Sequence, residues 1–175
     1  MNTDAASTQP EPRRCWISVG SNVEREASIR GALRDLRDAY GGLVISPVYE
    51  TEAMGFEGDA FYNLVVGSRS KQTVAEIRHT LQTIEEGRGR LRGAERFAPR
   101  TIDLDLLTWG DAVGLIDGYE LPRDEILKYA FVLAPLADVA PRERHPIDGR
   151  RFAELWRDMA PSSTALRRVD LALEG

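Results

Sequence analysis

The segment from residue 103 to residue 109 constrains the fold of this chain most strongly, because its residue types alternate. Consecutive side chains of a β-strand point to opposite faces. Asp103 and Asp105 would therefore share one face, and Ile102, Leu104 and Leu106 would share the other. The apolar face needs a core to cover it. The segment is predicted to be a strand that is buried on one side and carries two carboxylates on the other.

A loop rich in arginine precedes this strand, with five arginines in thirteen residues, at positions 88, 90, 92, 96 and 100. Two adjacent carboxylates repel each other unless a cation lies between them, and Mg²⁺ binds one or two carboxylates together with water and phosphate oxygens. Guanidinium groups bind further phosphate oxygens as planar forks. The combination predicts a metal and polyphosphate site. The plainer alternative is a solvated loop beside the wet face of an antiparallel sheet.

The composition narrows the class of protein. The 175 residues fit a disordered tail over residues 1–12 and a single domain over residues 13–175. The formal charge of −5 makes the arginine loop a local positive region, which favours a small anionic ligand over nucleic acid. The single cysteine and the lack of a long apolar run or a signal-peptide core predict a cytoplasmic protein without membrane contact. Nothing indicates an obligate protein partner.

The hydrophobic patterns follow the order β-α-β-β-α-β up to residue 109. Strands are expected at residues 15–20, 43–51 with an interruption at Pro47, 61–68 and 103–109. Helices are expected at residues 25–40 and from Thr73, which forms a capping box with Glu76, to Gly87. This is the split β-α-β order of an α+β, ferredoxin-like sandwich, an open sheet with helices on one face. A hairpin, helices near residues 131–136 and 152–159, and a terminal segment would follow as additions.

Phe61 and Asn63 would share one face of the third strand, because they are two residues apart. An aromatic plane beside an amide that both donates and accepts hydrogen bonds suits a flat heterocycle. Taken alone, the pair is better explained by an ordinary core phenylalanine and a polar residue at a strand end.

Residues 15–146 resemble the family of 6-hydroxymethyl-7,8-dihydropterin pyrophosphokinase, of the folate pathway. The most specific match is the segment Arg96-Phe97-Ala98-Pro99-Arg100-Thr101-Ile102-Asp103-Leu104-Asp105. Shorter matches are Ile17-x-Val19-Gly20-Ser21-Asn22, Thr51 with Gly55, Phe61-Tyr62-Asn63, Gln82-x-Ile84-Glu85 and Phe131-Val132-Leu133-Ala134-Pro135-Leu136.

The resemblance implies an enzyme that transfers pyrophosphate from ATP to the hydroxymethyl group of the dihydropterin, giving the pterin diphosphate and AMP. It implies that Asp103 and Asp105 hold two Mg²⁺ ions and that Arg90 and Arg100 are catalytic residues that stabilise phosphate charge. The implied pterin-binding residues are Thr51, Ala53, Met54, Gly55, Phe61, Asn63 and Phe131. The implied ATP-binding residues are Gln82, Glu85, Arg92, Arg96, Phe97, Leu106, Arg123 and Tyr129.

The chain departs from the family pattern mainly on the nucleotide side. Arg123 stands where a histidine is common, and Tyr129 stands where an arginine is common. Phe97-Ala98 replaces a usual Trp-Gly, and Ala53 replaces a common proline. Two other functions fit the sequence. One is a catalytically altered paralogue that binds a pterin or nucleotide in a regulatory role. The other is an RNA-binding module of the same topology, and the acidic net charge counts against it.

Overall fold

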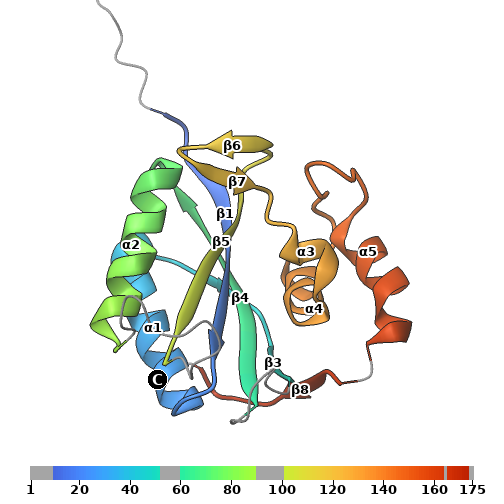
Figure 1. Ribbon diagram of the computed structural model, residues 1–175, viewed down its shortest axis with the longest axis horizontal. Coiled ribbons are helices and arrows are strands. Elements are labelled where there is room, and N and C mark those ends of the chain that lie inside the picture. The colour runs from blue at the N-terminus through green and yellow to red at the C-terminus, as the bar shows by residue number, and fades with distance from the viewer. Residues whose placement is uncertain (1–9, 52–59, 90–100, 164, 174–175) are drawn as a thin grey trace, which may run out of the picture.

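The structure is a computed structural model that describes residues 10–51, 60–89, 101–163 and 165–173. An antiparallel sheet forms its centre (Figure 1). Among these residues its strands run in the order β5 (Asp103–Trp109), β1 (Arg13–Ser21), β4 (Phe61–Ser70), β3 (Val48–Thr51) and β8 (Arg167–Val169), and β2 (Val44–Ile45) also pairs with β4. The order of the first four strands is that of the ferredoxin-like fold, which confirms the predicted topology.

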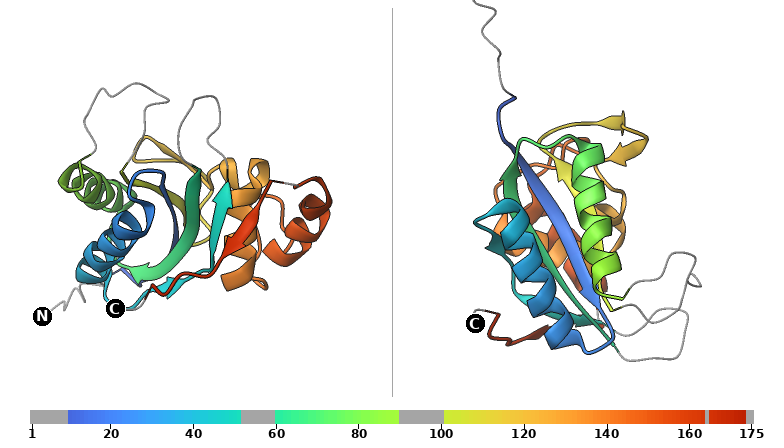
Figure 2. Two further views of the ribbon diagram at one scale, coloured as in Figure 1. Left: turned by 90° about the horizontal axis from the view of Figure 1, so that it is seen from below. Right: turned by 90° about the vertical axis from the view of Figure 1, so that its left-hand side faces the viewer.

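Two helices cover one face of the sheet and lie side by side, α1 (Arg25–Tyr40) and α2 (Val74–Gly87) (Figure 2). The capping box of Thr73 and Glu76 begins α2, as the sequence predicts. Apolar residues at helical spacing on both helices meet alternate residues of the strands. The resulting core includes Ile29, Leu33, Ile77 and Leu81 from the helices and Ile17, Val19, Leu104 and Leu106 from the strands.

Helices also pack on the opposite face, so the prediction of helices on one face only was incomplete. These are α3 (Glu125–Lys128), α4 (Ala130–Val139) and α5 (Phe152–Met159) (Figures 1 and 2). The physical reason lies in the strands, because Trp16, Val65 and Leu107 present apolar side chains to this face and would otherwise be exposed to water. They form a second core with residues of α4 and α5, including Leu133, Leu136, Phe152 and Leu155.

The remaining elements are short. The predicted hairpin is formed by β6 (Gly114–Ile116) and β7 (Tyr119–Leu121). Three of the described elements were not predicted: the helix α3, the 3₁₀ turn η1 (Ala160–Ser162) and the strand β8, which pairs with β3 at the edge of the sheet. In the described part of the chain, no helix has both the length and the apolar character to span a bilayer.

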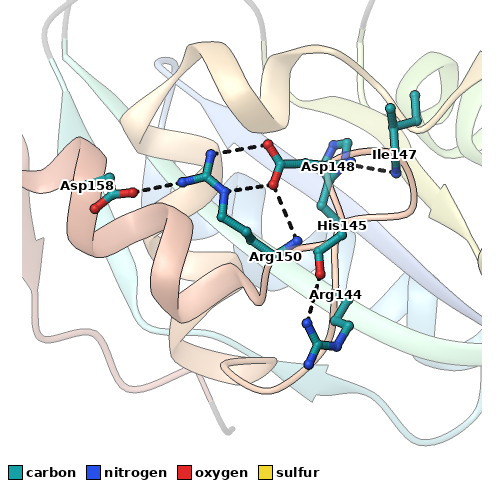
Figure 3. Close-up of polar contacts among 7 residues, drawn as sticks. Arg144, His145, Ile147, Asp148, Arg150 and Asp158 are labelled. Atoms are coloured by element: carbon teal, nitrogen blue, oxygen red, sulfur yellow. Dashed lines mark hydrogen bonds and ion pairs between the residues drawn. The ribbon is translucent and has the colours of Figure 1, made fainter.

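The connection between α4 and α5 is organised around His145 (Figure 3). The Nδ1 atom of this buried histidine accepts hydrogen bonds from the backbone N–H groups of Ile147 and Asp148, at 3.2 Å and 3.0 Å. Arg150 then joins the carboxylates of Asp148 and Asp158, at 2.7 Å and 2.8 Å. Because Nδ1 must be unprotonated to accept, this turn is built on a neutral imidazole.

Candidate functional site

A cavity of about 250 Å³ opens on the sheet face that α4 partly covers. The strands β1, β3, β4 and β5 and the helices α3 and α4 all contribute to its wall. The lining residues are Ser18, Val19, Gly20, Thr51, Phe61, Asn63, Leu64, Asp103, Asp105, Leu107, Glu125, Tyr129, Phe131 and Val132. Seven residues predicted to bind metal, pterin or ATP therefore line this cavity, namely Thr51, Phe61, Asn63, Asp103, Asp105, Tyr129 and Phe131.

The two aspartates come from the beginning of the edge strand β5. In the register of the sheet, Asp103 lies opposite Gly20 and Asp105 lies opposite Ser18 of β1. The alternation predicted from the sequence is present, because Leu104 and Leu106 belong to the core on the helix-covered face. Both carboxylates consequently face the cavity side, where a hydrated cation has access to them.

Gly20 forms part of the cavity floor. It pairs with Asn63 on one side and with Asp103 on the other. A Cβ atom at this position would lie 3.3 Å from Oδ1 of Asn63, closer than most Cβ contacts, so glycine keeps the floor open there. The strand β1 continues one residue beyond its expected end, to Ser21, which pairs with Tyr62 of β4.

A hydrogen bond across two strands orients the amide in the cavity. The Nδ2 atom of Asn63 donates to Oγ1 of Thr51 at 2.9 Å, and Thr51 is the cross-strand partner of Phe61. The donated bond fixes which way the buried amide points, so that its oxygen lies over Gly20. The amide and the ring of Phe61 thus stand on the same face of β4, as their spacing predicts.

Aromatic rings from the α3–α4 region form the opposing wall. The rings of Tyr129 and Phe131 are stacked, with centroids 5.0 Å apart and planes inclined by 14°. Phe131 lies in the first turn of α4, and Phe61 reaches the same cavity from β4. A flat, partly apolar ligand between these walls would contact aromatic faces and reach an oriented amide with its edge.

Arg123 is paired with Glu125 at the rim. Its guanidinium donates to both carboxylate oxygens, at 3.2 Å and 2.9 Å, and lies 4.8 Å from the centre of the Tyr119 ring. Partial burial opposes the charged form, but the hydrogen bond to Glu125 and the negative charges of Tyr119, Glu125 and Asp105 together outweigh it and raise the pKa of Arg123. Burial, and next the charge of Asp105, raise the pKa of Tyr119 to about 12. The charges of Arg123, Glu125 and Asp105 therefore interact with one another at one edge of the cavity.

Several predicted residues do not reach the cavity. Gln82 is exposed on α2, and Glu85 is buried on the same helix, where it accepts a hydrogen bond of 3.3 Å from the backbone N–H of Leu104. The side chain of Leu106 lies in the core on the opposite face of the sheet. Eight further predicted residues lie outside the described residues: Ala53, Met54, Gly55, Arg90, Arg92, Arg96, Phe97 and Arg100.

The donor set of the cavity suits a hard cation. Within the described ranges no three histidine, cysteine or acidic side chains form a cluster able to hold a metal. Asp103 and Asp105 nevertheless offer two carboxylates on one face, which is the number that Mg²⁺ commonly takes from a protein when phosphate and water complete its shell. The donors thus fit Mg²⁺ bound together with a polyphosphate.

Ser18 lines the cavity although no sequence motif indicates it as a site residue. It contributes because β1 lies between β4 and β5, and Gly20, which belongs to the match Ile17-x-Val19-Gly20-Ser21-Asn22, lies on the same strand. The sequence left open whether Arg123 faces a nucleotide or pairs with Asp124 or Glu125, and the structure pairs it with Glu125.

Comparison with known proteins identifies consistent relatives. The family model described as 7,8-dihydro-6-hydroxymethylpterin-pyrophosphokinase (HPPK) matches residues 16–141. A protein named 2-amino-4-hydroxy-6-hydroxymethyldihydropteridine pyrophosphokinase from Pseudomonas aeruginosa is 34% identical over 151 residues, which covers 82% of this chain and 90% of the relative. A Bacillus subtilis protein of the same name is 34% identical over 128 residues, which covers 71% of this chain and 76% of the relative.

Longer proteins match over only part of their length. A protein from Arabidopsis thaliana named folate synthesis bifunctional protein is 33% identical over 151 residues, which is 84% of this chain but 31% of that protein. The crystal structure of wild-type HPPK-DHPS from Plasmodium falciparum superposes with a TM-score of 0.69 at 13% identity, covering 94% of this chain and 50% of that one. At that identity the superposition supports the fold.

Proposed function

The chain belongs to the 7,8-dihydro-6-hydroxymethylpterin-pyrophosphokinase family, and we propose that it transfers the pyrophosphate of ATP to the hydroxymethyl group of 6-hydroxymethyl-7,8-dihydropterin in folate biosynthesis. The hydroxymethyl oxygen forms a bond to the β-phosphorus, and the bond from that phosphorus to the oxygen of the α-phosphate breaks. The products are the pterin diphosphate and AMP, with the hydroxyl proton released. ATP is the co-substrate of this reaction.

The observation that carries the proposal is the composition of one cavity. Phe61, Asn63 and Phe131 supply the aromatic faces and the amide that a pterin requires, and Asp103 and Asp105 lie in the same cavity. The bicyclic pterin would stack between the aromatic walls while Asn63 hydrogen-bonds its edge. This orientation would direct the hydroxymethyl group toward the carboxylate end, where the phosphates of ATP are expected.

Phosphoryl-type transfer depends chiefly on positioning and charge neutralisation. Two Mg²⁺ ions, held by Asp103 and Asp105, would supply positive charge to the phosphate oxygens. The protein's own contribution is to hold the pterin and those carboxylates on one rigid sheet. We propose that Arg90 and Arg100 bind the transferring phosphates and that Arg92, Arg96 and Phe97 line the nucleotide. These five residues are assigned from the resemblance and lie outside the described residues.

Product identification tests the proposal. The protein would be incubated with ATP, MgCl₂ and reduced 6-hydroxymethylpterin, and the products separated and weighed by mass spectrometry. AMP together with the pterin diphosphate supports pyrophosphate transfer. ADP with a pterin monophosphate would indicate a different transfer, and binding of both ligands without turnover would favour a regulatory paralogue.

A further inference from the structure

Arg25, at the start of α1, ties together the ends of two strands. Its Nη1 atom donates to Oε2 of Glu50 on β3 and to the backbone carbonyl of Ala60 next to β4, each at 2.9 Å. Its guanidinium carbon lies 3.9 Å from the centre of the Tyr62 ring. One partly buried cation therefore contacts residues on both sides of the segment that joins β3 to β4.

This cluster lies behind the cavity rather than in it. Glu50 and Tyr62 are cross-strand partners, and the next pair in the ladder is Thr51 with Phe61. Side chains of consecutive strand residues point to opposite faces, so Glu50 and Tyr62 point toward α1 while Thr51 and Phe61 point into the cavity. Arg25 thus holds, from the reverse face, the two strand ends whose next residues line the cavity.

A second arginine supports Glu50 from the edge of the sheet. Arg167 of β8 pairs with Glu50 in the register, and its Nη2 atom lies 2.8 Å from Oε1 of the carboxylate. The hydrogen bond from Arg167, followed by that from Arg25, keeps the pKa of Glu50 below its ordinary value. The carboxylate therefore stays charged, and each of its oxygens has a separate cationic partner.

We propose that Arg25 is a positioning residue for the pterin: it fixes the spacing of Thr51, Phe61 and Asn63 by clamping β3 to β4 from the opposite face. The inference rests on the proposed function, because it assumes that the pterin occupies the cavity. Asp103 and Asp105 lie on β5, which β1 and β4 separate from β3. Loss of Arg25 should therefore weaken pterin binding and leave nucleotide binding almost unchanged.

The decisive comparison is between Arg25→Met and Arg34→Met. Methionine keeps much of the stem but removes the donors and the charge, and Arg34 is an exposed residue of the same helix. Isothermal titration with reduced 6-hydroxymethylpterin should show a dissociation constant about five- to tenfold higher for Arg25→Met, the scale of one charge-assisted hydrogen bond. The constant for Mg-ATP should stay within about twofold, and Arg25→Lys should recover part of the pterin affinity.

The outcomes of these titrations distinguish the proposed function from the proposed role of Arg25. If the unmodified protein binds no pterin, the proposed function and this inference fall together. If it binds pterin and Arg25→Met binds it equally well, the inference is wrong while the proposed function stands. If Arg25→Met does not fold, Glu50→Gln gives a second route, because it keeps the shape and removes the charge. A pterin dissociation constant unchanged in Glu50→Gln would also overturn the inference, and a selective rise would support it.

Discussion

The guanidinium of Arg123 makes two hydrogen bonds to the carboxylate of Glu125, at 3.2 Å and 2.9 Å, at the rim of the cavity that Glu125 lines. The family commonly has a histidine at position 123, whose charge would depend on pH near neutrality. Here the position carries a permanent cation with its own counter-ion. The pair is about one-third exposed on each side, so its strength should be modest.

The ion pair predicts opposite effects for its two members. Glu125→Gln removes a negative charge and releases Arg123 toward phosphate, so Mg-ATP should bind about two- to fivefold more tightly. Arg123→Ala leaves Glu125 near Asp105 without its counter-ion and should weaken Mg-ATP binding at both pH 6 and pH 8. Arg123→His should weaken it more at pH 8, where the imidazole is neutral. Titration calorimetry at both pH values measures these effects. If all three variants bind Mg-ATP as tightly as the unmodified protein does, Arg123 takes no part in nucleotide binding.

The carboxylates of β5 are predicted to hold the metal. Asp103→Asn and Asp105→Asn each keep the size of the side chain and remove one charge, so Mg²⁺-dependent binding of ATP should fall by about tenfold or more. Binding of pterin alone should change little. Titration of ATP with and without MgCl₂ measures the effect. Undiminished Mg²⁺-dependent binding in Asp105→Asn would show that the metal is held elsewhere.

The aromatic walls should contribute to pterin affinity specifically. Phe131→Ala removes a ring that lines the cavity and is stacked on Tyr129, so the pterin dissociation constant should rise about tenfold. Leu115→Ala, at an exposed apolar residue of the β6–β7 hairpin, is the matched control. A greater loss of ATP affinity than of pterin affinity in Phe131→Ala would place the heterocycle elsewhere.

The floor of the cavity tolerates only a small residue at position 20. In Gly20→Val the Cβ atom would stand 3.3 Å from Oδ1 of Asn63, and the added methyl groups would project into the cavity. Pterin affinity should fall by about tenfold or more, and Gly20→Ala should have a smaller effect. Fluorescence titration of the pterin measures both. Full affinity in Gly20→Val would mean that the ligand does not approach this floor.

His145 predicts an acid-sensitive contribution to stability. Burial lowers its pKa in the folded state, partly opposed by Asp148. The unfolded chain therefore takes up a proton first, and stability is full above the unfolded pKa of about 6.5 and declines as pH falls below that value. His145→Gln should lose less thermal stability than the unmodified protein between about pH 7.5 and pH 5.5. Parallel melting curves for the two proteins across this range would contradict the assignment.

Sequence reasoning succeeded where one local pattern determined the structure. The helical spacing of Ile29 and Leu33, the capping box at Thr73 and the alternation around Asp105 each specify an element and its buried face. Together with the β-α-β-β-α-β order, these patterns were sufficient for the topology and for the carboxylate pair. The resemblance to a known family added Phe131 and the chemistry, and it supported Phe61 and Asn63, which their spacing alone indicated only weakly.

The features of the fold and the site that the sequence did not predict depend on contacts between segments that are distant in the sequence. The strand β8 is three residues long and has no alternation, so only its pairing with β3 identifies it. The apolar helix α4 gives no indication of which sheet face it covers, because its buried residues lie all around it. Gly20 became a floor residue because the order of the strands places it between Asn63 and Asp103.

Product stoichiometry is the most direct test of pyrophosphate transfer. A time course with ATP, Mg²⁺ and reduced 6-hydroxymethylpterin would quantify every nucleotide and pterin product by chromatography, with Asp105→Asn as the matched control. We predict that AMP and the pterin diphosphate accumulate in equimolar amounts and that the control forms neither at a comparable rate. ADP with a pterin monophosphate, or no product from a protein that binds both substrates, would contradict the proposed function.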